Sequence, residues 1–233
     1  MKVWVYVEGE SDRLALRELW TSWRTRLGTA GWGIHLVPLA NKAQYLRKVG
    51  PRAAEKLVAD PSDIVVGLPD LYPHLPDASG PYKHDSLDDL RGLQTNLVED
   101  ALIQTQGISR AETQTCLDRF LATALKHDLE MLLLAAKDRL RAVLGTRDRL
   151  GKWRSPPEDQ DQMNPPKKIV QGLFRTKSAR HSSYKDTVHA PAVLRKVADL
   201  REVLFTDHGA ENCPVFREML DRVGNKTGIP AYE

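Results

Sequence analysis

The spacing of hydrophobic residues divides the chain into strands and helices. A run from Val3 to Val7 is apolar or aromatic at every position, which is typical of a strand covered on both faces. The next segment repeats its apolar residues at helical spacing, and Ser11 or Glu10 can cap its start. Read in the same way, the chain gives strands at 3–7, 33–39, 63–68 and 119–126, and helices at about 10–28, 41–59, 85–106, 128–144, 166–173, 191–204 and 213–223.

The order of these elements predicts the fold class. Strands and helices alternate, which favours parallel crossover connections and an α/β sheet flanked by helices. The Gly50-Pro51 pair predicts a break in the helix at 41–59. The Pro-rich segment 68–82 predicts a long loop after the third strand, a common place for function.

The C-terminal part of the chain differs in character from the α/β part. Residues 145–168 are polar and contain several prolines, which indicates a flexible excursion. We therefore expect an α/β core at 1–145. Residues 146–233 are expected to form a basic loop and a helical extension packed on that core.

Composition excludes some classes of protein and leaves others open. The chain has 233 residues, enough for one large domain or a domain with an appendage, and its net charge of +3 does not by itself indicate a nucleic-acid partner. Cys116 and Cys213 match no metal spacing and are interpreted as free thiols in a reducing compartment. We find no signal peptide and no apolar run of the ~20 residues that span a membrane, so a cytoplasmic protein without a membrane partner is expected.

Three carboxylates stand near the expected ends of strands. Glu8 follows the first strand, Asp70 follows the third, and Glu130 begins the helix after the fourth. Because ligands of parallel α/β sheets bind outside the carboxyl ends of the strands, we expect the three to converge. Converging carboxylates repel one another, and a Mg²⁺ or Mn²⁺ ion would relieve this repulsion and could polarise a phosphate.

Each of these acids also has an ordinary structural explanation. Glu8 suits the first turn of a helix because of the helix dipole, and Asp70 suits the start of a turn. Glu130 has apolar neighbours, so it needs a partner, which is either a metal or a structural Lys or Arg. His127 is interpreted as a helix cap, a phosphate contact or a proton shuttle.

Taken together, several motifs resemble those of a known superfamily. They are V-E-G-E-S-D at 7–12, D-L-Y-P-H-L-P at 70–76, H-D-L-E-M-L-L-L-A at 127–135, P-P-K-K-I at 165–169 and C-P-V-F at 213–216. The first resembles the opening motif of the toprim superfamily of topoisomerases, primases and overcoming-lysogenization-defect nucleases. The whole set is similar to a bacterial toprim-like family of unknown function, often encoded beside an AAA-type ATPase and associated with phage defence.

The resemblance implies a toprim-like (Rossmann-like) fold and metal-dependent phosphodiester chemistry, with an ATPase as partner. It makes Glu8 the metal-linked or acid–base residue. The usual second motif, D-x-D, reads Asp70-Leu71-Tyr72 here, so one carboxylate is replaced by a tyrosine. Glu130 or Asp77 would have to compensate for it.

A basic stretch follows the polar excursion. Residues 167–185 hold six Lys or Arg and no acid, which suits contacts with phosphates, although a solvated surface loop would look the same. Lys168, in the matching P-P-K-K-I, is the first candidate for a cation that faces the phosphate. The further candidates for nucleic-acid binding are Lys167, Arg175, Lys177 and Arg180.

Two functions therefore compete. The first is a Mg²⁺-dependent toprim-type nuclease that cleaves DNA or RNA, with Glu8, Asp70 and Glu130 at the metal and His127 and Lys168 beside them. The second is a catalytically inactive toprim-like subunit that docks nucleic acid or the ATPase. Self-association is open in both. A small-molecule α/β enzyme is disfavoured, because G-x-G-x-x-G, G-x-x-x-x-G-K-[ST] and G-x-S-x-G motifs are absent.

Overall fold

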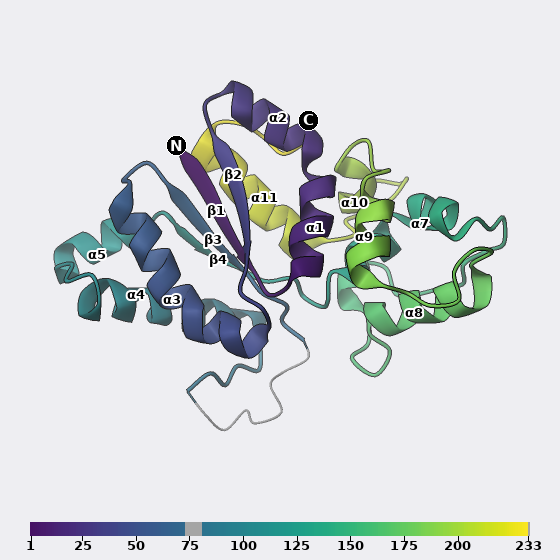
Figure 1. The fold of residues 1–233 in the computed structure, drawn as a ribbon, viewed down its shortest axis with the longest axis horizontal. Helices are drawn as coiled ribbons and strands as arrows, with labels where there is room; N and C mark the ends of the chain where they lie inside the picture. The colour runs from purple at the N-terminus through teal and green to yellow at the C-terminus, as the bar shows by residue number, and fades with distance from the viewer. Residues whose placement is uncertain (73–80, 233) are drawn as a thin grey trace. The chain divides into compact units, whose positions relative to one another are not determined.

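The chain folds into two compact units, each built from two separate segments. The computed structural model describes residues 1–72 and 81–232. The first unit contains Met1–Gly9 and Arg24–Leu125, and the second contains Glu10–Trp23 and Lys126–Glu233. The elements, drawn in Figure 1, are β1 (Lys2–Val7), α1 (Glu10–Leu19), α2 (Thr21–Thr29), β2 (Gly33–Pro38), α3 (Lys42–Ala59), β3 (Ile64–Leu68), α4 (Leu87–Gln104), α5 (Arg110–Leu117), β4 (Phe120–Ala122), α6 (Glu130–Ala135), α7 (Lys137–Leu144), the 3₁₀ helix η1 (Pro157–Asp159), α8 (Pro166–Lys177), α9 (Asp186–Leu194), α10 (Arg201–Leu204) and α11 (Pro214–Thr227).

The first unit is built on a four-stranded sheet that is parallel throughout, as the sequence predicts. The strand order is β2-β1-β3-β4. Val5 of β1 pairs with Leu36 of β2 on one side and with Val66 of β3 on the other. All five residues of β3 are buried, as expected for a continuous apolar strand. The direction of the crossovers reverses at β1, so the pair β1/β3 is the switch point of this sheet.

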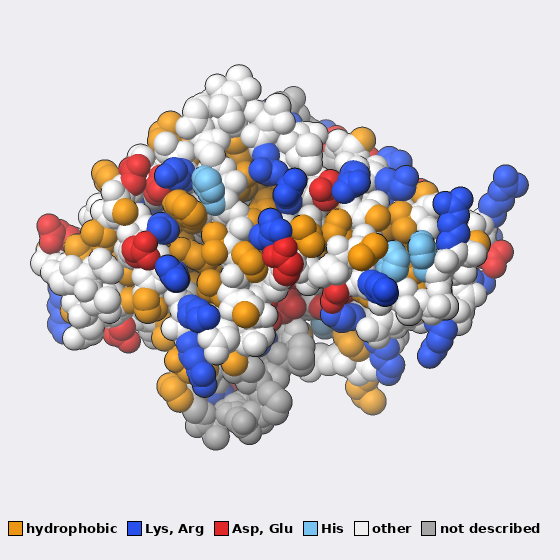
Figure 2. Space-filling model, viewed as in Figure 1, with side chains coloured by type: hydrophobic (Ala, Val, Ile, Leu, Met, Phe, Trp, Pro, Cys, Tyr) orange, Lys and Arg blue, Asp and Glu red, His pale blue; other side chains and the backbone are white. Residues whose placement is uncertain are grey.

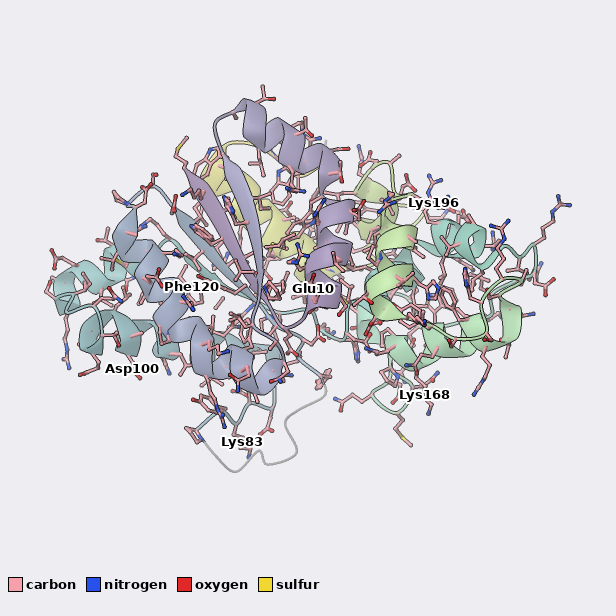
Figure 3. All side chains as sticks on the ribbon, in the orientation of Figure 1. Glu10, Lys83, Asp100, Phe120, Lys168 and Lys196 are labelled. Carbon is pink, nitrogen blue, oxygen red and sulfur yellow. The ribbon has the colours of Figure 1, made fainter. Side chains whose placement is uncertain are left out.

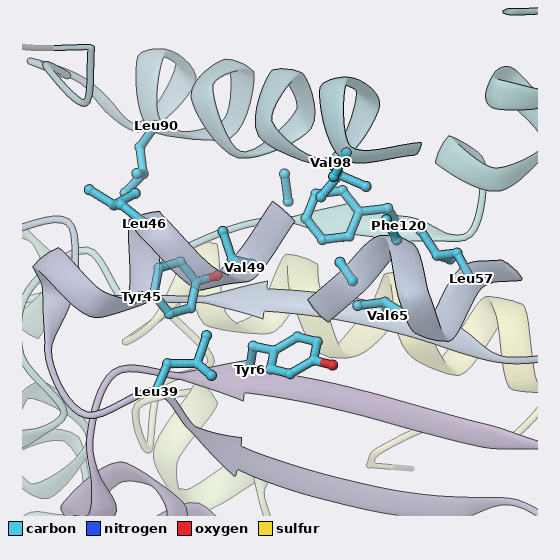
Figure 4. Close-up of a cluster of buried hydrophobic side chains, with 14 of the residues drawn as sticks. Tyr6, Leu39, Tyr45, Leu46, Val49, Leu57, Val65, Leu90, Val98 and Phe120 are labelled. Atoms are coloured by element: carbon cyan, nitrogen blue, oxygen red, sulfur yellow. The ribbon is translucent and has the colours of Figure 1, made fainter. Parts of the chain in front are cut away.

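Helices α3, α4 and α5 cover one face of this sheet. Tyr6 and Val65 point from the strands into a cluster with Val49 of α3 and Val98 of α4 (Figure 4). Phe120 of β4 completes the contact with α4 and is 5% exposed. Burial of this apolar surface is the main favourable term in folding the unit.

Helix α3 runs through Pro51 without a break, so the predicted interruption is wrong. Gly50 lies against the backbone of α4, where a β-carbon would overlap the Leu97 carbonyl oxygen. The Tyr6 hydroxyl donates a hydrogen bond to the Arg52 carbonyl at 3.0 Å, one residue after the proline. Packing against α4 and β1 thus holds α3 in one piece although proline is unfavourable in a helix interior.

The second unit is mainly helical. Helix α1 packs against α9, and Arg195 at the end of α9 contacts Glu18 of α1 at 2.8 Å. Trp20 stacks on Phe216 of α11, with ring centroids 6.2 Å apart. Helix α6, whose Met131 to Leu134 are all buried, packs against α8.

The boundary between the units differs from the predicted one at residue 145. Residues 126–145 belong to the second unit, because α6 packs against α8 and α7 packs against α9. Three predicted helices are also divided, and the one predicted at 191–204 falls into the end of α9 and the separate α10. Where α1 meets α2, the Thr21 hydroxyl donates hydrogen bonds to the carbonyls of Arg17 and Glu18, a contact that often bends a helix. Ala136, at φ −78° and ψ 47°, separates the buried α6 from the amphipathic α7.

The Pro-containing segment 145–168 is anchored, which corrects the prediction of a flexible excursion. Its 3₁₀ helix carries Glu158, a fully buried carboxylate. That carboxylate accepts hydrogen bonds from the backbone N–H groups of Val215 at 2.9 Å and Phe216 at 3.0 Å. Cys213, the N-cap residue of α11, makes no side-chain capping bond. The two hydrogen bonds from Glu158 serve as the cap, although Glu158 is distant in sequence.

The two cysteines are free, as predicted, and both are buried. Burial raises the pKa of the Cys213 thiol well above its ordinary value. None of the helices in residues 1–72 and 81–232 has both the length and the apolar character that a membrane crossing requires.

Candidate functional site

Glu8 and Asp70 lie side by side at the carboxyl edge of the sheet. Glu8 follows β1 directly, and Asp70 lies two residues beyond β3, the neighbouring strand. The backbone N–H of Asp70 donates a hydrogen bond to Glu8 Oε1 at 3.1 Å. Asp70 also bridges to Leu125, which extends the pairing of β3 and β4 toward this edge. The two acids therefore share the switch point of the sheet, where α/β proteins bind ligands.

A lysine that sequence reasoning missed lies beside both acids. Lys42 is the first residue of α3 and is 7% exposed. Its ammonium donates a hydrogen bond to the Leu71 carbonyl at 2.8 Å. Burial lowers the pKa of Lys42, and the negative charges of Glu8 and Asp70 act in the opposite direction. The edge thus holds two carboxylates and one buried cation.

The sequence does carry a signal for Lys42. A helix N-terminus favours acids, because the helix dipole places positive charge there. The first turn of α3 contains no acid and begins with this lysine, after the N-cap Asn41. A cation in that position is electrostatically unfavourable unless carboxylates lie nearby, and Glu8 and Asp70 meet this need.

A buried network of hydrogen bonds joins α3, α4 and the residue after β4 near the same edge. The Tyr45 hydroxyl of α3 donates to Gln94 Oε1 at 2.7 Å, and Gln94 Nε2 donates to the Thr123 carbonyl at 2.8 Å. Burial raises the pKa of Tyr45 well above its ordinary value, with a further contribution from the charge of Glu8. Gly67 of β3 makes room for the network, since a β-carbon there would lie 2.6 Å from the Tyr45 hydroxyl. Tyr72 stands where the D-x-D motif has its second aspartate, and it packs against the hydrophobic cluster between the sheet and α3 and α4.

Glu130 lies in the second unit, where it belongs to a group of charged residues around Lys167. It is 2% exposed, and the Lys167 ammonium lies 3.9 Å from its Oε1 and 3.2 Å from Asp186 Oδ2. The Lys167 backbone N–H donates to both oxygens of Asp128 at 3.1 Å. A structural lysine, one of the two partners expected from the sequence, is therefore present. A metal-binding role for Glu130 stays a prediction.

Burial and mutual repulsion disturb the protonation of this group. Burial raises the pKa of Asp128, and the nearby charge of Glu130 raises it further. Burial also raises the pKa of Glu130, whereas Lys167 and the Tyr184 hydroxyl act to lower it. The two carboxyls titrate as a pair, so protonation of one favours ionisation of the other.

His127 is buried in the same unit, with 2% of its surface exposed. Burial lowers its pKa, and a hydrogen bond with the Gln160 backbone opposes this effect. The N-cap residue of α6 is Leu129, two residues after His127. Phosphate binding and proton transfer by His127 stay predictions.

The predicted basic stretch separates into paired and exposed cations. Lys167 is held by acids as described, and Lys177 forms an ion pair with Asp148 at 3.0 Å. Lys168 is exposed on α8, where its ammonium donates to the Met163 carbonyl at 3.2 Å (Figure 3). Arg175 and Arg180 are exposed as well. Figure 2 shows Lys and Arg side chains spread over this face of the C-terminal helices.

The donor atoms at the sheet edge suit a hard cation. Mg²⁺ is commonly held by one or two carboxylates together with waters, and Glu8 and Asp70 supply two within one unit. Across the residues described, no group of three or more His, Cys, Asp or Glu is arranged to hold a metal ion. Asp77, the other acid expected to compensate, lies in segment 73–80, outside the described residues.

The four-stranded parallel sheet agrees with the α/β class that the motifs implied. Membership of the toprim superfamily stays a prediction from those motifs. Comparison of the chain with protein-family models, with curated proteins and with solved structures gives no match.

Proposed function

We propose that the chain is a Mg²⁺-dependent nuclease of the toprim type that hydrolyses phosphodiester bonds in DNA or RNA. The observation that carries this proposal is the Glu8–Asp70 pair at the β1/β3 switch point, with the Lys42 ammonium beside it. Two carboxylates at one sheet edge are a common Mg²⁺ ligand set, and a metal ion held there would support phosphate chemistry. The partner ATPase and the role in phage defence, which the resemblance implies, are part of the same proposal.

The residues of the chain have distinct tasks in this reaction. Glu8 and Asp70 would hold the ion, which when bound polarises the phosphate and activates a water molecule. The positive charge of Lys42, which interacts with both Glu8 and Asp70, reduces the mutual repulsion of the two carboxylates. Exposed cations of the second unit, Lys168, Arg175 and Arg180, bind the nucleic-acid backbone.

Replacing Glu8 by glutamine tests the proposal. The change keeps the shape of the side chain and removes the charge that holds the ion, so Mg²⁺-dependent cleavage of single- and double-stranded DNA and RNA should fall at least ~100-fold. Glu10→Gln is the matched control. Glu10 is exposed and pairs with Arg13 in the first turn of α1, so its variant should cleave like the parent protein.

Cleavage that survives Glu8→Gln while Glu10→Gln behaves identically would show that the chemistry resides elsewhere. Circular dichroism and thermal unfolding of both variants establish that the fold is intact. Cleavage is measured with the protein alone and with an AAA-type ATPase, the kind of partner that the resemblance implies.

Replacing Lys42 by methionine gives a second expected result. Without Mg²⁺, the unfolding free energy should fall by about 2 kcal/mol, because the carboxylates lose their buried counter-charge. With millimolar Mg²⁺ the variant should recover more stability than the parent, since the ion no longer competes with the ammonium. Lys48→Met, at an exposed position of the same helix, should change neither quantity. Equal Mg²⁺ responses in Lys42→Met and the parent would show that the ion and Lys42 do not share the site.

A catalytically inactive binding subunit is the second candidate. Two observations favour it. Tyr72 packs against the core where the D-x-D motif has its second aspartate. The positive charge of Lys42 already offsets part of the negative charge of Glu8 and Asp70. Under this alternative no cleavage appears with the ATPase present, and Mg²⁺ leaves the thermal stability unchanged.

A further inference from the structure

A large cavity lies within the second unit and is lined by residues of that unit alone. Its volume is about 980 Å³. Its wall is formed by the end of α6, the first turn of α7, residues 151–157, α10 and the loop that follows α10. Pockets for small organic ligands have volumes of roughly 300–1,000 Å³, so this cavity has room for such a molecule.

Two aromatic residues line this cavity, Phe205 and the half-buried Trp153. The Lys137 ammonium lies 5.3 Å from the centroid of the Trp153 ring. A lysine over an indole face is held by a cation–π interaction and presents its remaining donors to a neighbouring group. A flat aromatic ring with a cation next to it is therefore available to a ligand.

The charge of the wall is positive. The basic residues that line it are Lys137, Arg139, Arg141, Lys152, Arg154 and Arg201. Its acids are Asp138, Glu202 and Asp207. Basic residues thus outnumber acids, which attracts an anion.

Ion pairs fix part of this wall and leave the part near Trp153 available. The pairs are Arg139–Glu202 at 2.7 Å, Arg141–Asp138 at 2.8 Å and Arg154–Asp161 at 3.2 Å. Lys137 and Lys152 have no ion pair with any carboxylate of the described chain. Lys137 lies over the Trp153 ring, and Lys152, the residue before Trp153, lines the same cavity.

We infer that this cavity binds a nucleotide, with the base stacked on Trp153 and the phosphate between Lys137 and Lys152. A nucleotide combines the two features that the wall selects, a flat aromatic ring and an anionic phosphate. Stacking of a base on an aromatic side chain is favourable and tolerant of sequence, because every base has a flat π-face. The ligand is a free nucleotide or one unit of a single strand. The inference does not require the proposed nuclease activity, because no residue of the Glu8–Asp70 edge contributes to it.

Binding to the full-length protein in EDTA tests this site without cleavage. The two probes are AMP, followed by calorimetry, and a fluorescein-labelled eight-nucleotide thymidine strand, followed by anisotropy at low salt. Trp153→Ala should weaken binding at least ~10-fold, and Trp153→Phe should weaken it less, because phenylalanine retains a stacking face. Lys137→Gln, at an exposed position, should weaken binding ~3- to 10-fold.

Lys196→Gln is the matched control, since Lys196 is an exposed lysine of the same unit that does not line the cavity (Figure 3). It should bind both probes like the parent protein. Binding of AMP assigns the site to free nucleotides, and binding of the strand alone assigns it to single-stranded nucleic acid. The inference is overturned if the parent binds neither probe, or if Trp153→Ala and Lys137→Gln bind both as the parent does. Repeating the measurement on Glu8→Gln, where equal affinity is expected, separates this outcome from failure of the nuclease proposal.

Discussion

Replacing Gly50 by alanine is expected to destabilise the protein by about 3 kcal/mol or more. Gly50 lies in the middle of α3, where that helix meets α4. A methyl group there would overlap the Leu97 carbonyl oxygen and also lie 3.3 Å from the Leu97 β-carbon. Backbone atoms of a packed helix cannot rotate away as a side-chain end can, so α3 and α4 have to separate. Overpacking of this kind typically costs 1–3 kcal/mol, and more where the surroundings cannot relax.

Gly92→Ala in α4 is the matched control for this prediction. A β-carbon at Gly92 would meet no atom within 4 Å. Because alanine is the better helix former, this variant should gain about 0.5–1 kcal/mol. Urea denaturation of both variants gives the comparison. A Gly50→Ala protein as stable as Gly92→Ala would show that the close approach of the two helices is not required.

Replacing Glu158 by alanine is the second change with a large expected effect, a loss of about 4 kcal/mol. Its carboxylate accepts hydrogen bonds from the N–H groups of Val215 and Phe216 at the start of α11. Leaving two buried N–H groups without a partner costs about 1–3 kcal/mol each. Asp159→Asn provides the control. Asp159 forms an exposed ion pair with Lys126, which typically contributes no more than about 1 kcal/mol. Equal denaturation midpoints for the two variants would contradict a capping role for Glu158.

Glu158 also makes stability depend on pH in a defined direction. Burial raises its pKa to about 7, although the two backbone hydrogen bonds act to lower it. An unfolded glutamate titrates near ~4.3, so between these values the folded state binds the extra proton. The stabilisation is complete below about pH 4 and is lost as pH rises through about 7, by roughly 4 kcal/mol in all.

The pH dependence is isolated by comparing the parent protein with Glu158→Gln, which cannot titrate. Subtracting the two curves of unfolding free energy against pH removes the contributions of all other groups. The difference should decline from pH 5 to pH 8. A flat difference over this range would show that the Glu158 carboxyl titrates near its ordinary value in the folded protein.

The sheet could be predicted because its signal is local. Four apolar runs separated by helical segments are sufficient to indicate parallel strands, and β3 is buried at every position. Helix α5 was missed because it has few apolar residues and its sequence lacks a clear hydrophobic face. The capping box formed by Ser109 and Glu112 was the available signal. The continuity of α3 through Pro51 depends on contacts with α4, and no local pattern reports such contacts.

The candidate site was predictable to the extent that strand ends determine it. Glu8 and Asp70 could be paired from the sequence, because neighbouring parallel strands bring their carboxyl ends to one edge. Lys42 comes from a helix start and became evident only through its position against the dipole of α3. The partner of Glu130, Lys167, could be anticipated as a residue type and not as a position. The capping of α11 by Glu158 depends wholly on tertiary structure.

The division of each unit into two segments has a consequence for the order of events during synthesis. All residues of the first unit have been made once Leu125 is complete. Helix α1 is made before most of that unit, yet it packs against α9, and the contacting residues Glu18 and Arg195 are 177 positions apart. Closing so long a loop is entropically costly and slow. Until the C-terminal helices emerge, α1 therefore lacks α9 and the neighbouring Trp20 lacks Phe216, so the docking of this segment should be among the last steps of folding.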